Sequence, residues 1–275
     1  MKNESAVPNL GRPLWEYDTV RDRFQTMNVR ERVKYILSGE MERNAGVRNM
    51  IDSTPLHVVE YYNSISDEAA RREIEDFALE LIDSPRVPER AWGFDLCGNL
   101  RISSAKEKLL RLLQEELKVP NSFWLGGLIG SLDKLEAAEA TPQIHRQALR
   151  YFTDKENQGV SSTALLALAH LDIDALLELL PRVVLEDQKA KQGLFASRLI
   201  ARMLQHHGTE ALERIAVALV PVRSQERLIQ DELEAALKDD FDLGKHFDQA
   251  EQKELVTRTW QKLLNFRKKQ QRGEG

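Results

Sequence analysis

The chain has 275 residues, a formal net charge of −5 and a pI of about 5.8. Its 42% hydrophobic and 30% charged residues are typical of a soluble protein. A protein whose whole surface binds nucleic acid is more often basic, so the charge argues against that role, although a local basic patch could serve it. There is no run of about 18 apolar residues and no apolar signal-peptide core, so we expect no membrane segment and a cytoplasmic location.

The pattern predicts an all-α chain, because strand-like alternation is scarce and most of the nine prolines fall at the borders of expected helices. We expect residues 1–14 to form an irregular arm and residues 15–82 to hold N-terminal helices. A helix is expected over 18–37 with a break near Met27 and Asn28, and a helical piece over about 40–50. A capping pair follows, with starts at Thr54-Pro55 and at Ser66 or Asp67.

The stretch from Asp83 to Leu204 repeats one frame four times. In each frame an acidic residue is followed 17 positions later by a leucine, and an apolar residue stands two positions before the acid. The acid and leucine pairs are Asp83 and Leu100, Glu115 and Leu132, Asp154 and Leu171, and Asp187 and Leu204. Frames of this length predict an array of helix pairs. We place the repeats at 83–114, 115–153, 154–186 and 187–220.

The first two repeats share further residues. The series Trp92, Leu96, Gly98 and Leu100 is matched at the same offsets by Trp124, Leu128, Gly130 and Leu132. We expect each glycine to let a neighbouring helix approach closely, since glycine otherwise costs a helix about 1 kcal/mol relative to alanine. In the third repeat, Pro181 is expected to kink its helix or to end it after Leu180.

These residues resemble a HEAT repeat. The series Leu-Ile-Asp, Arg-Ala and Leu-Cys-Gly-Asn-Leu within 81–100 carries the resemblance, and the other three frames fit it more loosely. It covers about half of the chain, and only the first repeat has the arginine, at Arg90. The resemblance implies a right-handed α-solenoid of stacked antiparallel helix pairs that serves as a binding scaffold. The acids of the four turns are expected to cap helix N-termini.

Beyond residue 220 the repeat frame is lost. Residues 221–266 are expected to hold C-terminal capping helices, over about 224–237 and 249–266, and residues 267–275 a basic tail. The segment 251–275 contains seven basic and three acidic side chains. Such a tail contacts nucleic acid or an acidic protein in some chains and only promotes solubility in others. Its basic residues beyond the last helix are Arg267, Lys268, Lys269 and Arg272.

No motif for a catalytic, metal or nucleotide site is present, so we assign no catalytic residue, metal or cofactor. Cys97 is expected to be a buried thiol, and His206-His207 an exposed helix end. The glycines at 126, 127 and 130 are interpreted as helix packing, and the aspartates at 239, 240 and 242 as a solvated turn without the spacing of a calcium loop.

The second helices of the pairs carry most of the basic residues that we expect on the concave face of the solenoid. These are Arg71, Arg72, Lys106, Lys108, Arg111, His145, Arg146 and Arg150. The next second helices carry Glu178, Glu210 and Glu213, so the basic stripe should fade or reverse its sign. The stripe is either a solvated, salt-bridged face or a groove for an acidic partner.

Our first hypothesis is a non-catalytic scaffold or adaptor that binds a protein partner through the concave face, as an inhibitor or an assembly factor. The alternative is a nucleic-acid role, because some HEAT-like solenoids are DNA glycosylases that remove alkylated bases in a basic groove. The acidic net charge disfavours this alternative.

Overall fold

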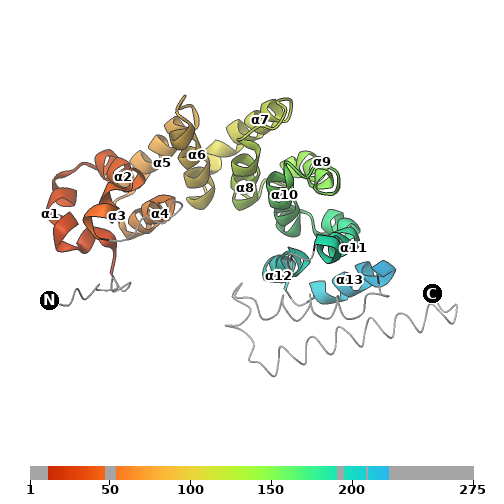
Figure 1. Cartoon of the computed structure of the whole chain (residues 1–275). Coiled ribbons are helices and arrows are strands. Elements are labelled where there is room, and N and C mark those ends of the chain that lie inside the picture. Colours follow the sequence, from red (N-terminus) through yellow and green to blue (C-terminus); the bar gives the residue numbers. More distant parts are fainter. Residues whose placement is uncertain (1–11, 47–53, 191–194, 209, 223–275) are drawn as a thin grey trace, which may run out of the picture. The chain divides into compact units, whose positions relative to one another are not determined.

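The computed structural model describes residues 12–46, 54–190, 195–208 and 210–222 (Figure 1). Within these ranges the chain forms 13 α-helices and five short 3-10 helices, and it contains no strand. The all-α prediction is therefore confirmed for the described residues. None of the helices in these ranges combines the length and the apolar character that crossing a bilayer requires.

The chain divides into two compact units, which are described one at a time. Unit 1 draws on residues 1–116 and 130–135, and unit 2 on residues 117–129 and 136–275. The division falls inside one helix, α8 (Leu125–Lys134). The four predicted repeats and their boundaries stay a prediction, and so does the solenoid.

Unit 1 contains seven further α-helices. They are α1 (Asp18–Thr26), α2 (Val29–Leu37), α3 (Glu40–Asn44), α4 (Thr54–Ser64), α5 (Glu68–Ile82), α6 (Val87–Asn99) and α7 (Lys106–Glu116). The 3-10 helix η1 (Leu14–Glu16) precedes α1, and η2 (Ser103–Ala105) leads into α7. In this unit α2 packs against α4 and α5, and α6 packs against α4 and α5.

The helix starts of unit 1 follow local signals in the sequence. The break predicted at Met27 and Asn28 is confirmed, because Asn28 forms a capping box with Glu31 that starts α2. Asp67 caps α5 by accepting a hydrogen bond from the amide of Ala69 at 3.0 Å. The predicted helix over 40–50 is too long, since α3 ends at Asn44 and the chain turns at Gly46 with φ of +72°. Most of the remainder of that prediction lies outside the described residues.

Unit 2 contains α9 (Thr141–Leu149), α10 (Gln158–Leu171), α11 (Ile173–Ala190), α12 (Phe195–His207) and α13 (Ala211–Ala218). Three 3-10 helices accompany them: η3 (Ala138–Ala140) precedes α9, η4 (Arg150–Phe152) joins α9 to α10, and η5 (Val220–Val222) follows α13. The helix α10 is central, because it packs against α9, α11 and α12. Figure 1 shows these neighbours beside it. The helix α11 does not end at Leu180, one of the two outcomes expected of Pro181, since it continues to Ala190.

Apolar side chains at helical spacing form the core of each unit. In α5 the stripe Ile74, Phe77, Ala78, Leu81 and Ile82 is buried throughout. Burying a side chain of this size contributes about 1.5–3 kcal/mol, so stripes of this kind supply most of the stability of a helical unit. An aromatic cluster holds the N-terminal end of unit 1, where Trp15 and Phe24 pack against Tyr61 at ring distances of 5.6 and 5.3 Å.

The two tryptophans that begin the shared series lie in different settings. Trp92 is in the middle of α6, whereas Trp124 directly precedes α8. The glycines differ too, because a Cβ at Gly98 would lie 2.9 Å from the Cα of Ser131, whereas a Cβ at Gly130 would have nothing within 4 Å. Close approach is thus confirmed at Gly98 and wrong at Gly130. The sequence match does not extend to the glycine packing.

Candidate interaction surfaces

The predicted basic residues of unit 1 are largely engaged by groups of their own unit. Lys108 donates to the carboxylate of Asp83 at 2.6 Å, and Arg72 pairs with Glu68 one helical turn away at 3.5 Å. The guanidinium of Arg71 lies 5.3 Å from the ring centre of Tyr62. Lys106 begins α7, and Arg111 is exposed on the same helix.

The same holds for much of the predicted set in unit 2. Arg150 pairs with Asp154 at 2.6 Å, and the Nε of Arg146 is 3.4 Å from the carbonyl oxygen of Pro142 in its own helix. His145 is half-buried on α9. Two of the acids that mark the repeats, Asp83 and Asp154, are therefore counter-ions of residues in the predicted basic stripe. The basic tail, Arg267, Lys268, Lys269 and Arg272, lies outside the described residues.

The four repeat acids have different roles. Asp154 accepts a hydrogen bond from the amide of Asn157 at 3.2 Å, just before α10, and its pKa is lowered by the side-chain hydrogen bond from Asn157 and by Arg150. Asp187 lies inside α11 and accepts the amide of Ala196 at 2.7 Å in the first turn of α12. Both fit the predicted capping role. Asp83 and Glu115 do not, because Asp83 follows the end of α5 and Glu115 lies exposed within the last turn of α7.

Asp187 is a buried acid. Its carboxyl group is almost fully covered, and burial raises its pKa above the ordinary value, while the hydrogen bonds from the amides of Ala196 and Phe195 oppose that rise. The result is a buried acid at a helix N-terminus, where the partial positive charge of the helix favours the ionised form. We assign it a structural role in starting α12.

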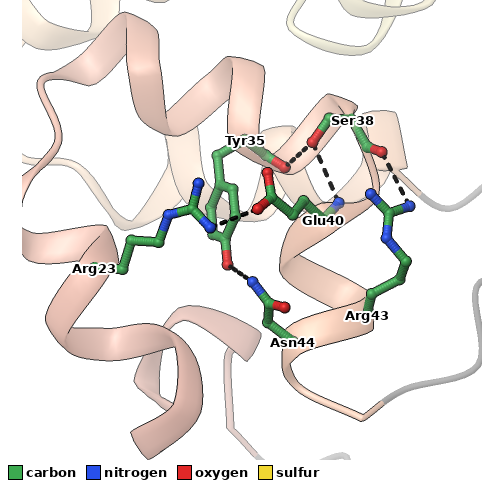
Figure 2. Close-up of polar contacts among 6 residues, drawn as sticks. All are labelled: Arg23, Tyr35, Ser38, Glu40, Arg43 and Asn44. Atoms are coloured by element: carbon green, nitrogen blue, oxygen red, sulfur yellow. Dashed lines mark hydrogen bonds and ion pairs between the residues drawn. The ribbon is translucent and has the colours of Figure 1, made fainter.

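A polar network fixes the short helix α3 in unit 1 (Figure 2). Glu40 accepts from the guanidinium of Arg23 in α1 at 2.5 Å, and Asn44 donates to the hydroxyl of Tyr35 in α2 at 2.6 Å. Arg43 donates to the carbonyl oxygen of Ser38 at 3.3 Å. The turn between α2 and α3 needs Gly39, whose φ is +68°.

The opposite face of α3 carries a buried carboxylate. Glu42 is 1% exposed, and its Oε1 lies 3.1 Å from Nε2 of His57 in α4. The other ring nitrogen, Nδ1, lies 3.0 Å from the carboxylate of Glu60, which is largely exposed. Both ring nitrogens thus face carboxylate oxygens, so the imidazole can bridge α3 and α4. No sequence pattern signalled this bridge, because its partners belong to different helices and to no shared motif.

A groove of about 610 Å³ lies between α2, α5 and α6 in unit 1. Its aromatic lining is Phe77 and Trp92, and the guanidinium of Arg30 and the ammonium of Lys34 lie 4.8 and 5.6 Å from the ring centre of Phe77. Glu80 of the lining pairs with Arg30. This carboxylate of the lining is therefore held by a cation from outside it.

The remaining acid of this groove is held in the same way. Glu89 accepts from the hydroxyl of Ser84 at 2.6 Å and from Arg86 at 3.2 Å. The hydrogen bond from Ser84 is the main cause that lowers the pKa of Glu89, followed by the contribution of Arg86. The lining is close to neutral in sum, so we do not regard this groove as a site for a strongly charged ligand.

The loop between α7 and α8, residues 117–124 in unit 2, presents an aromatic side chain to solvent. Phe123 is 73% exposed, and its ring meets that of Trp124 edge-on at 5.3 Å. Val119 in the same loop is also exposed. Sequence reasoning missed this site, because a single phenylalanine in a polar turn belongs to no periodic stripe.

Hydrogen bonds hold this loop in place. Asn121 has φ of +54°, and its side-chain oxygen accepts from Asn157 at 2.7 Å. The hydroxyl of Ser122 is buried and accepts from the amide of Trp124 at 3.2 Å. Asparagine is one of the few residues that adopts a positive φ readily, and here its side chain is used as well. Phe123 is therefore exposed on a braced loop.

The other residues singled out from the sequence lie as follows. Cys97 is fully buried, and burial raises the pKa of its thiol to about 12, which confirms a structural thiol. His206 and His207 end α12 on the exposed side, as expected, but the ring of His206 also stacks on His170 at 3.8 Å. The described residues contain no group of three or more histidine, cysteine or acidic side chains that could hold a metal ion. The turn at 239–242 lies outside the described residues.

Comparison of the chain with known protein families, with curated proteins and with solved structures gave no match.

Proposed function

We propose that the protein is a non-catalytic binding scaffold whose helix pairs form a HEAT-like array and whose partner is another protein. The cytoplasm is the compartment that we propose for it. The observation that carries this proposal is the exposure of Phe123 on the braced loop of residues 117–124. Leaving a phenylalanine in water forgoes about 1.5–3 kcal/mol of burial free energy, and a binding partner can recover it.

The surroundings of Phe123 support an interface rather than an isolated exposed residue. Single exposed apolar side chains are common on protein surfaces and need no explanation. Here Val119 is exposed on the same loop, and Trp124 is half-exposed beside Phe123. Aromatic side chains are enriched at the centres of protein interfaces, and a rigid anchor loses little entropy on binding.

The predicted basic stripe supports the proposal less than the sequence indicated. Lys108 and Arg150 are each held by a carboxylate at 2.6 Å, and Arg72 by a weaker surface pair. Phosphates would have to displace these carboxylates, so this pairing also weakens the case for a DNA-binding groove. A titration with duplex DNA at low salt separates the two functions, since a DNA-binding protein should then show strong, salt-sensitive binding.

The decisive experiment places a photo-cross-linking phenylalanine analogue at position 123 in cells. We expect adducts of discrete mass with a protein partner, and we expect excess unlabelled protein to suppress them. The matched control carries the analogue at Leu56, which is 55% exposed at the start of α4 in unit 1. Equal yields of adducts at the two positions, or none at position 123, would refute the assignment of this loop as an interface.

Substitutions of Phe123 test the same side chain without a cross-linking reaction. Phe123→Ser should abolish partner capture, and Phe123→Tyr, which keeps the ring, should retain most of it. Because Phe123 is so exposed, neither change should alter thermal stability by more than about 0.5 kcal/mol. A large loss of stability in Phe123→Ser would mean that the ring serves the fold instead.

A further inference from the structure

A second surface of unit 2 has a different chemistry. A groove of about 570 Å³ runs between α11 and α13, two helices that pack against each other. On α11 it is lined by Asp174, Leu177, Glu178 and Pro181, which share one face because they recur at helical spacing along α11. On α13 the apolar lining is Val217, which is 42% exposed, and Ala218.

Pro181 lines the groove and removes one backbone hydrogen bond from α11. The helix continues through Pro181, which has no amide hydrogen. The carbonyl group of Leu177, one helical turn earlier, therefore lacks the donor that any other residue at position 181 would supply. Both residues line the groove.

The charges of the groove are predominantly acidic. Three carboxylates line it, those of Asp174, Glu178 and Glu213, against one guanidinium, that of Arg214. Arg214 pairs with Asp174 across the groove. The lining thus carries a formal charge of −2, from three acids and one base. The sequence pattern indicated this change of sign, since acidic residues replace basic ones on the later second helices.

We propose that this groove binds a basic amphipathic helix of a partner protein. The apolar face of such a helix packs on Leu177, Pro181 and Val217, and its lysines or arginines face Glu178. Amphipathic helices bind in grooves of this kind through apolar anchors that recur at helical spacing, and complementary charge sets their orientation. This site is separate from Phe123, so either one can fail without the other.

The test uses a synthetic helical peptide of leucine and lysine with the same 18-residue length as α11, and an acidic peptide with every lysine changed to glutamate. Binding to the full chain is measured by fluorescence anisotropy. We expect the basic peptide to bind and the acidic one not to bind. Glu178→Lys should weaken the basic peptide about tenfold, because an attraction becomes a repulsion. Glu156→Lys makes the same charge change on an exposed residue of unit 2 outside the groove and should weaken it less than about twofold.

Binding of the acidic peptide to Glu178→Lys tests whether the charge at position 178 selects the peptide. Glu178→Lys should bind the acidic peptide more tightly than the wild-type chain does, and circular dichroism should show that the variant remains helical. Equal losses in Glu178→Lys and Glu156→Lys would show that only the overall charge matters and would overturn the proposal. No binding of the basic peptide to the wild-type chain would overturn it as well. Retained peptide binding in Phe123→Ser would show that the two surfaces act independently.

Discussion

Two glycines that occupy the same place in the sequence repeat should respond in opposite ways to the same substitution. Gly98→Ala in α6 adds a methyl group 2.9 Å from the Cα of Ser131, and Gly130→Ala in α8 adds one that meets nothing within 4 Å. We expect the first change to destabilise the protein and the second to stabilise it. The contrast isolates packing from helix propensity, because both positions are helical.

The magnitudes follow from two opposing terms. Replacing glycine by alanine in a helix contributes about 1 kcal/mol of stability through propensity, and Gly130→Ala should show this gain undiminished. Overpacking a close contact costs about 1–3 kcal/mol. At Gly98 the contacted atom belongs to the backbone and cannot rotate away, so the upper part of this range applies. Once the propensity gain is subtracted, the net effect of Gly98→Ala is a loss of about 1–2 kcal/mol.

Thermal unfolding followed by circular dichroism measures both variants. For a chain of this size each kcal/mol shifts Tm by about 2–4 °C, so the two variants should move to opposite sides of the wild type. Gly159→Ala in α10, where a Cβ also meets nothing within 4 Å, is the control for the propensity gain. If Gly98→Ala raised Tm as much as Gly130→Ala, the close approach of α6 and residue 131 would be wrong.

Three further changes test the buried groups. His57→Ala removes a partner of the buried Glu42 and should cost about 2–3 kcal/mol in urea unfolding. Glu60→Ala, on the exposed side of the same ring, should cost less than about 1 kcal/mol, and equal costs would contradict the buried bridge. Burial raises the pKa of Asp187 in the folded state. The wild type should therefore gain stability relative to Asp187→Asn as pH falls through that raised pKa toward the ordinary 3.8. Parallel curves of unfolding free energy against pH for the two proteins would exclude this linkage. Cys97, with a pKa of about 12 and no exposed surface, should resist iodoacetamide at about pH 8 until the protein is unfolded, and rapid labelling of the native chain would show that the thiol is accessible.

Local signals in the sequence predicted the helices well. The cap at Asp67 and the break at Asn28 each depend on residues close together in the chain, and each is found where the pattern placed it. The expectation that α11 could end before Pro181 is not met, since the helix continues to Ala190. A proline removes one hydrogen bond and strains one turn, but the packing of α11 against α10, α12 and α13 offsets that cost.

Contacts between distant residues were beyond the reach of such signals. The acids of the repeats and the basic residues of the second helices were interpreted as separate features, yet Lys108 and Asp83 form one ion pair across 25 residues of sequence. The repeat frame assigned Gly98 and Gly130 the same role, because a frame records positions and not neighbours. The interaction surface at Phe123 was missed for a related reason, since exposure of a lone aromatic residue follows from the fold around it.

The pairing of Lys108 and Arg150 with carboxylates has a kinetic consequence. A cation and an anion only 2.6 Å apart act at a distance as a dipole, and the potential of a dipole decays faster than that of a single charge. These residues therefore exert little long-range electrostatic attraction on an approaching molecule. Encounter near either pair should proceed at the rate that diffusion and orientation allow, and added salt should change that rate very little.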